Sequence, residues 1–337
     1  MDRPKRWLIT SILISLGSIP LILFVIPQTS VTGDTFRSLE NIKGEYLLLA
    51  IGIHALALIL WGMRLKVLTN AIGGDIGLFE SMKVIIPSLF AACITPSKVG
   101  GEPVRIHLLK EKGISRGDST AVVVGERLLD AFFLGLFMPL SIYFSRGHYE
   151  LVMSPVFRPA VLFFIFLMGV LGYILGRPED IKRLIAWFAR RMSIDRHIEK
   201  INSDIDDFYT TFRWFMKNGR RSLLLAMVFT SLFWLAEVSI ASFILIGLGI
   251  NPMWGTSFAA QIILAVFITI PITPGSSGVA EFGITSLYST LVTSTAMLGV
   301  FVLVWRFVTY YINFIIGGIA GGALCLKILR DRESTRD

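Results

Sequence analysis

Two short polar stretches interrupt apolar segments of this chain, and their residue types could bind an anion. The first is Thr-Pro-Ser-Lys-Val-Gly-Gly-Glu at residues 95–102, and the second is Thr-Pro-Gly-Ser-Ser-Gly-Val-Ala-Glu at residues 273–281. An arginine follows each stretch within a later apolar segment: Arg127 lies 32 residues after the first threonine, and Arg306 lies 33 residues after the second. This matched spacing indicates an internal duplication, and inverted repeats with broken helices are typical of secondary transporters.

The prolines and glycines of the two stretches predict broken helices. A proline ends the helix that enters, and the glycines Gly100, Gly101, Gly275 and Gly278 let the chain turn with a positive φ. The half-helix that returns then begins with unpaired N–H groups, which together with the helix dipole favour an anion such as phosphate. Because hydrocarbon cannot satisfy such groups, the stretches must be buried in protein or line a polar cavity.

Arg306 and Glu237 fall in the middle of apolar segments. A charge there costs about 2.5–3.5 kcal/mol even on a lenient insertion scale, so each must face a partner or a cavity. In one interpretation Arg306 pairs with Glu281 or Glu237; in the other Arg306 and its repeat mate Arg127 present guanidinium groups to a phosphate. Glu102 and Glu281 are either helix caps or groups that act on substrate or protons. The residues predicted to bind substrate are Thr95, Gly100, Gly101, Glu102, Arg127, Glu237, Thr273, Gly275, Gly278, Glu281 and Arg306.

The composition is that of a polytopic membrane protein. Of the 337 residues, 54% are hydrophobic and 17% are charged, against about 25% charged in a typical soluble domain. The mean hydropathy is +0.69. The net charge of +8 marks cytosolic loops rather than a nucleic-acid partner. The two cysteines, Cys93 and Cys325, permit neither a disulfide framework nor a zinc site, and we expect no metal or cofactor.

Apolar runs close to the roughly 20 residues that cross a bilayer predict six transmembrane helices. The distribution of lysine and arginine places both chain termini in the cytosol. Two further apolar segments, within residues 78–116 and 254–291, are short and contain the polar stretches. We expect each to enter and leave on one side of the membrane, as a re-entrant hairpin. The six predicted spans are residues 7–26, 46–63, 120–144, 156–175, 223–248 and 296–326.

These elements predict a single all-α membrane domain, residues 1–337, built on an inverted repeat. Three spans separate the two hairpins, and this odd number makes the hairpins open to opposite leaflets. Repeat one is residues 46–145, and repeat two is residues 222–326. The hydrophilic block between them, residues 177–221, has eleven Lys or Arg against seven Asp or Glu. Its periodicity predicts amphipathic helices on the cytosolic membrane surface.

The last span contains two overlapping Gly-x-x-x-Gly pairs. They are Gly317 with Gly321 and Gly318 with Gly322. Small residues at this spacing let another helix approach closely, so we expect a helix-packing face here rather than a ligand site.

A serine-protease pattern occurs in the second polar stretch. Gly275-Ser276-Ser277-Gly278 matches the Gly-x-Ser-Gly of intramembrane rhomboid proteases, in which a later histidine activates the serine. No histidine follows Ser277, and the four histidines of the chain are scattered along it. The sequence also has no Walker loop, HExxH or CxxC. We therefore expect neither an enzyme nor an ATP-driven transporter.

The two polar stretches and the segment Gly-Glu-Arg-Leu-Leu-Asp at residues 125–130 resemble the flippase-like, UPF0104-type family, which is related to the transmembrane part of lysylphosphatidylglycerol synthases. The resemblance covers the chain from about the second span to the last. It implies a module that moves an aminoacylated phospholipid between leaflets, next to a soluble domain that makes the lipid. Only a short tail follows Leu326, so we expect no synthase activity. Ser276 and Ser277 depart from a more glycine-rich family pattern.

The function that these features favour is lipid translocation without an ATPase. The phosphate of a phospholipid or polyprenyl-phosphate lipid would visit a polar midplane cavity in the cell membrane, where Arg127 and Arg306 neutralise it. Glu102, Glu237 or Glu281 would couple protonation or bind a cationic headgroup. Two alternatives stay open: a secondary transporter of a small soluble anion, and a non-transporting accessory subunit of an envelope biosynthesis complex. The oligomeric state, a homodimer included, is not determined by the sequence.

Overall fold

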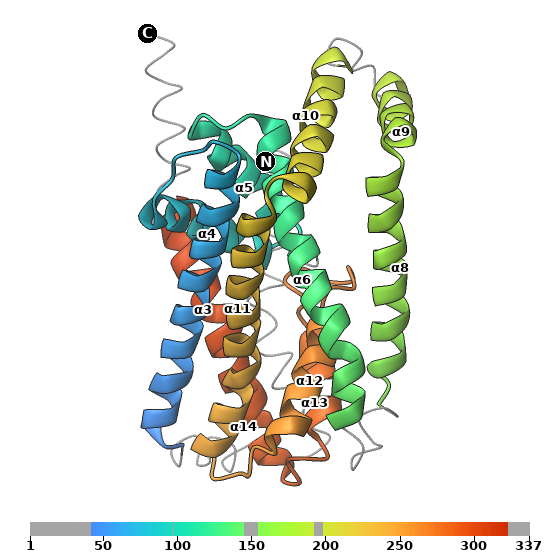
Figure 1. Cartoon of the computed structure of the whole chain (residues 1–337). Coiled ribbons are helices and arrows are strands. Elements are labelled where there is room, and N and C mark those ends of the chain that lie inside the picture. Colours follow the sequence, from blue (N-terminus) through green and yellow to red (C-terminus); the bar gives the residue numbers. More distant parts are fainter. Residues whose placement is uncertain (1–41, 97, 145–153, 192–197, 323–337) are drawn as a thin grey trace, which may run out of the picture.

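The computed structural model describes residues 42–96, 98–144, 154–191 and 198–322, and these residues form helices joined by turns (Figure 1). The expectation of an all-α membrane protein is confirmed for this part of the chain. The predicted first span, residues 7–26, lies outside the described residues.

Long helices form the bundle and run side by side in Figure 1. Within the described residues, four helices are long and apolar enough to cross a bilayer: α3 (Gly44–Ala71), α8 (Phe157–Gly176), α11 (Arg220–Gly247) and the helix Thr295–Gly322. They correspond to the predicted spans that begin at residues 46, 156, 223 and 296. The helix α6 (Arg116–Phe144) has 29 residues, which at 1.5 Å per residue spans about 43 Å. The last helix begins as α14 (Thr295–Arg306) and continues through a π-helical segment, η2 (Phe307–Tyr311).

Two pairs of short helices are inserted at opposite ends of this bundle. The helices α4 (Leu78–Cys93) and α5 (Gly101–Glu111) pack against each other, and so do α12 (Trp254–Phe267) and α13 (Val279–Tyr288). Figure 1 shows α4 and α5 in the upper part of the bundle and α12 and α13 in the lower part. Each pair is interrupted by one of the two polar stretches. We name the segment that joins α4 to α5 the first turn, residues 94–100, and the segment that joins α12 to α13 the second turn, residues 268–278.

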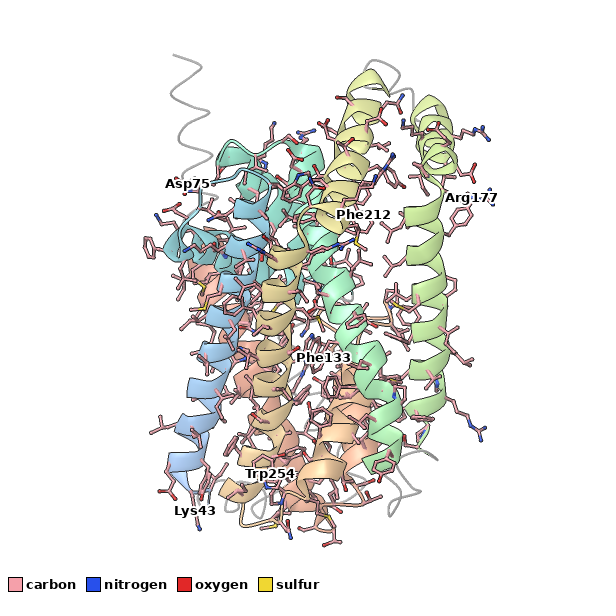
Figure 2. The ribbon with its side chains drawn as sticks, viewed as in Figure 1. Lys43, Asp75, Phe133, Arg177, Phe212 and Trp254 are labelled. Atoms are coloured by element: carbon pink, nitrogen blue, oxygen red, sulfur yellow. The ribbon has the colours of Figure 1, made fainter. Side chains whose placement is uncertain are left out.

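The helices α3 and α11 are antiparallel and pack along their length, so the two sequence repeats meet there. In Figure 2, Lys43 before α3 and Trp254 after α11 lie at the lower end, while Asp75 after α3 lies at the upper end. One group of buried apolar side chains, which includes Ala50 and Ile244, fills the lower half. A second group, which includes Leu65 and Ala226, fills the upper half.

The hydrophilic block is helical, as predicted, and forms α9 (Pro178–Arg191) and α10 (Ile198–Lys217). The helix α10 packs on α6. Phe208 and Tyr209 are buried against Ala121, and the Tyr209 hydroxyl donates to the backbone oxygen of Ile174. The sequence showed the apolar face of α10 but not which helix covers it.

Glycines of the last helix allow it to approach α4 closely. A Cβ on Gly317 would lie 2.6 Å from the backbone nitrogen of Phe90 and 3.0 Å from the backbone oxygen of Ile86. A Cβ on Gly318 would lie 3.3 Å from the Phe90 ring. A Cβ on Gly322 would have no neighbour within 4 Å. The predicted packing face is therefore confirmed for Gly317 and Gly318.

Gly317→Ala should destabilise the protein, because the new methyl group would collide with backbone atoms of α4 that cannot move independently. Overpacking of this kind costs about 1–3 kcal/mol. Gly322→Ala is the matched control and should leave the melting temperature unchanged or slightly higher, since alanine favours helix. The measurement is the thermal unfolding of the purified full chain in detergent. Equal melting temperatures for the two variants would show that α4 does not pack there.

Candidate functional site

The two turns meet each other although 178 positions separate their threonines. The backbone N–H of Gly275 donates to the backbone oxygen of Thr95 at 2.9 Å. Pro96 and Pro274 form an isolated antiparallel bridge around this hydrogen bond. Each turn therefore satisfies part of the irregular backbone of the other, which is how such backbone can exist away from water.

The two turns also share an unusual backbone conformation. The second residue after each proline has a positive φ, 61° at Lys98 and 57° at Ser276. Non-glycine residues rarely adopt such angles, and they do so where the surrounding structure holds them. Both residues donate their backbone N–H to the threonine of the same turn, Lys98 to Thr95 at 3.2 Å and Ser276 to Thr273 at 3.1 Å. The two turns, which have similar residue types in the sequence, thus have similar backbone geometry as well.

The predicted roles of the glycines are confirmed for one turn and wrong for the other. Gly275 and Gly278 have φ of 57° and 83°, as expected. Gly100 has φ of −63° and Gly101 belongs to α5. Glycine is required at these two positions because a side chain has no room there. A Cβ on Gly100 would lie 2.4 Å from the Thr95 side chain, and one on Gly101 would lie 3.0 Å from a backbone oxygen of α4.

The threonine hydroxyls are used inside the turns. Thr95 Oγ1 donates to the Ala91 backbone oxygen at 2.8 Å and accepts from the Gly100 N–H at 2.8 Å. Thr273 Oγ1 donates to the Ser277 backbone oxygen at 2.6 Å. Their geometry therefore assigns the two threonines a part in shaping the turns.

An arginine–glutamate pair with the same atoms in contact recurs in the two repeats. Arg127 Nε lies 2.6 Å from Glu102 Oε1, and Arg306 Nε lies 2.7 Å from Glu281 Oε1. Both pairs join residues 25 positions apart. The pairing interpretation of Arg306 is therefore realised, with Glu281 as its partner. Glu281 also accepts from the Gly278 N–H at 2.6 Å, so it caps α13 as well.

The two pairs differ in exposure. The side chains of Arg306 and Glu281 are each only 2% exposed. Those of Arg127 and Glu102 are 41% and 28% exposed. Because the pairs are repeat mates, this difference shows that the two halves of the molecule are not in equivalent environments.

The segment η2 gives Arg306 a second contact. The guanidinium carbon of Arg306 lies 4.2 Å from the centre of the Tyr310 ring, a cation–π contact. The Tyr310 hydroxyl donates to the backbone oxygen of Cys93 at 3.1 Å. Single π turns often occur at functional sites, and here the π turn joins the arginine of repeat two to the end of α4 in repeat one.

A second group of charges lies around Arg64, which is 2% exposed. Arg64 Nη1 donates to Asp130 Oδ1 at 2.6 Å, and Arg64 Nε donates to Glu126 Oε1 at 3.2 Å. The indole N–H groups of Trp61 and Trp234 donate to the same two carboxylates, at 2.9 Å and 3.0 Å. Arg127 Nη1 lies 3.5 Å from Asp130 Oδ2, which joins this group to the pair of repeat one.

Arg105 completes this group and has spare donors. It is 1% exposed, and its Nε lies 3.6 Å from Glu126 Oε2, which is too long for a hydrogen bond. Within the described residues, Arg105 Nε and Nη2 have no hydrogen-bond partner. Arg64 and Arg105 are missing from the predicted site, because the positive-inside rule already accounts for basic residues near the ends of apolar segments.

Lys98 in the first turn is also missing from the predicted site. Its charge is within electrostatic reach of Glu237, Arg306 and Arg127. No carboxylate of the described residues forms an ion pair with Lys98, whereas Arg127 and Arg306 each have a glutamate. The sequence did offer a signal, because Lys98 is the only charged residue in the sequence of the two turns.

Glu237 lies in the middle of α11, within electrostatic reach of Lys98. Its side chain is 20% exposed, and Oε1 lies 2.7 Å from Nδ1 of His54 in α3. Glu237 is therefore not the partner of Arg306. The structure thus gathers at the centre the two turns, Lys98 and the His54–Glu237 pair.

The family model described as lysylphosphatidylglycerol synthase TM region matches residues 8–317. A UPF0104 membrane protein of Archaeoglobus fulgidus is 32% identical over 321 residues, which cover 92% of this chain and 94% of that protein. UPF0104 membrane proteins of Pyrococcus horikoshii and Methanothermobacter thermautotrophicus are 22% identical over 300 residues and 24% identical over 299 residues. The first match covers 85% of this chain and 89% of the relative, and the second covers 83% of each. No solved structure matches.

Arg306→Gln should lower the melting temperature more than Arg127→Gln does. Removing one partner of a buried pair leaves an uncompensated charge and costs about 3–5 kcal/mol. Glu102 is partly exposed, so water can hydrate its carboxylate when Arg127 is substituted. The double variant Arg306→Gln with Glu281→Gln leaves no unmatched charge at this position, and we expect it to be more stable than Arg306→Gln alone. Thermal unfolding of the purified variants measures this, and equal losses in both single variants would contradict the difference in burial.

Proposed function

The chain belongs to the family of the lysylphosphatidylglycerol synthase TM region, and on this premise we propose that it is a lipid translocase for a phosphate-bearing lipid. The family description names a membrane region of a synthase whose product is a phospholipid. A phospholipid or a polyprenyl-phosphate lipid of the cell membrane is therefore the proposed substrate class. Neither the proposed movement nor the site involves an enzymatic step.

The proposed topology has six spans and two re-entrant hairpins, with both termini in the cytosol. The two short helix pairs lie at opposite ends of the bundle (Figure 1), as hairpins that open to opposite leaflets would. The end that holds α4 and α5 also holds the basic hydrophilic block, so this end is assigned to the cytosol. In this arrangement the contact between the two turns lies near the bilayer midplane.

The observation that carries the proposal is the position of Lys98. It is a cation without an ionic partner among the described residues, placed where the two turns meet. A charge at the membrane midplane is costly unless it is matched. An anion that arrives at the turns would match it, and the phosphate of a lipid headgroup is an anion that can reach the midplane while its tails stay in hydrocarbon.

The arginine–glutamate pairs flank this position from the two repeats. Arg127 and Glu102 are the exposed pair, so a headgroup can reach Arg127 by displacing Glu102, while Asp130 holds Nη1 in place. Arg306 and Glu281 are the buried pair and close the opposite side. Arg105, which has spare N–H donors on the repeat-one side, offers a further contact to phosphate oxygens. The charges on the two sides thus provide successive positions for one phosphate.

Lys98→Gln should strongly reduce lipid transfer, because it removes a central cation that has no carboxylate partner among the described residues. Fluorescent phosphatidylglycerol in reconstituted vesicles, with dithionite added outside, measures transfer between leaflets. We expect at least about a tenfold loss in rate, as for a charge-assisted contact worth roughly 1.5–3 kcal/mol. Lys110→Gln removes an exposed lysine at the end of α5 and is the matched control.

Two further arms of this experiment separate the alternatives. The transfer rate of a fluorescent ceramide, which has no phosphate, should be the same with and without Lys98. Uptake of inorganic phosphate without lipid transfer would identify a transporter of small anions instead. Lipid transfer at the same rate in vesicles with and without the wild-type protein would refute the proposed function.

A further inference from the structure

His54 is held between two acceptors in the centre of the bundle. Its Nδ1 lies 2.7 Å from Glu237 Oε1, and its Nε2 lies 3.0 Å from Asn313 Oδ1. The three residues come from α3, from α11 and from the helix that follows η2. His54 is 3% exposed, so its ring nitrogens have these partners in place of water.

The orientation of the Asn313 amide fixes one proton of His54. Asn313 Nδ2 donates to the backbone oxygen of Thr309 at 3.0 Å. The opposite amide orientation would bring Asn313 Oδ1 against that oxygen, and two acceptors repel each other. Asn313 Oδ1 therefore faces His54 and must accept a hydrogen bond, which requires a proton on Nε2 of His54.

A second proton is required between His54 and Glu237. If Nε2 of a neutral imidazole has the proton, Nδ1 is an acceptor. An acceptor at 2.7 Å from a carboxylate oxygen would be repelled. The contact is attractive only when Nδ1–H donates to an ionised Glu237 or when a protonated Glu237 donates to Nδ1. In both cases the pair holds one exchangeable proton beyond the neutral histidine and the ionised carboxylate.

We propose that His54 and Glu237 form a proton-binding site, and that its loading couples the proposed lipid movement to a proton gradient. This coupling rests on the proposed function, whereas the proton site itself stands on the geometry alone. The site lies at the contact of α3 with α11, where the two repeats pack. Loss of the proton replaces a hydrogen bond between the repeats with repulsion, so occupancy of the site acts on how the repeats meet.

The charge of Lys98 links the proton to the substrate. Lys98 is within electrostatic reach of both His54 and Glu237. From the last helix, Asn313 is neutral, and Arg306 is already paired with Glu281. Without its proton the pair has one negative charge, which matches Lys98. With the proton the pair is neutral, and Lys98 is free for a phosphate. Proton and phosphate therefore favour each other's binding, and such coupling is reciprocal.

The chain supplies a matched control for this site. His107 and Glu111 form an exposed pair on α5, with Nε2 and Oε1 3.4 Å apart and side chains 57% and 47% exposed. Glu237→Gln removes the titrating carboxylate but keeps a side chain whose N–H can donate to His54 Nδ1. Glu111→Gln makes the same change in the exposed pair. His54→Gln is the second variant of the central pair, in case Glu237→Gln does not yield folded protein.

The transport test uses vesicles with fluorescent phosphatidylglycerol and an internal pH dye. For the wild type and Glu111→Gln, an imposed pH gradient should drive net lipid transfer together with proton movement. Glu237→Gln and His54→Gln should lose the response to the gradient by about tenfold, within the range usual for coupled sites. If the wild-type rate of lipid transfer does not change with the pH gradient, and all variants transfer lipid at the same rate, the proposed proton coupling is wrong. Lipid transfer itself would still be established.

The proton site is tested without transport by ¹⁵N NMR of histidine-labelled protein in nanodiscs, with the His54 signal identified by its loss in His54→Gln. We expect both ring nitrogens of His54 to be protonated or to share a proton at neutral pH. Raising the pH, or Glu237→Gln, should convert the ring to a single neutral tautomer. A neutral tautomer in the wild type at every pH would refute the proton site. If the wild type moves no lipid, this measurement still decides the site, and only the proposed function fails.

Discussion

The structure depends on one backbone contact, the hydrogen bond from Gly275 N–H to the Thr95 oxygen. A helix that breaks inside a membrane protein exposes peptide groups that hydrocarbon cannot satisfy. Here the break in one repeat is matched by the break in the other, and each turn supplies part of the polar surface that the other needs. This contact holds the two turns in register with each other.

The same constraint governs the charges. Each repeat places an arginine against a glutamate with the same atoms in contact, and the group around Arg64 alternates cations with carboxylates. Burial of these residues is tolerated because each charge has an opposite charge or an aromatic ring beside it. Among the described central charges, Lys98 has no ion-pair partner. Comparison with the second turn shows where this difference arises. Ser276, the structural counterpart of Lys98, has the same positive φ but no charge, so only one of the two turns contains a cation.

The two repeats are related but not equivalent. The pair in repeat two is buried, the pair in repeat one is partly exposed, and a π turn follows the arginine of repeat two. The α3–α11 contact, where His54 and Glu237 lie, joins the two halves.

The sequence by itself determined that the chain is helical and where the short helix pairs are interrupted, because hydropathy, proline and glycine act over short distances. The nearly equal spacing of threonine and arginine also pointed to Arg306 and Glu281. Only the tertiary structure decided which charges meet. His54 and Glu237 lie 183 positions apart, and Arg64 lies 66 positions from Asp130. A charged residue in an apolar segment looks the same in a sequence whether it is paired or free. Its partner depends on how the helices pack, and this is why the surroundings of Lys98, Arg105 and His54 became visible only in the folded chain.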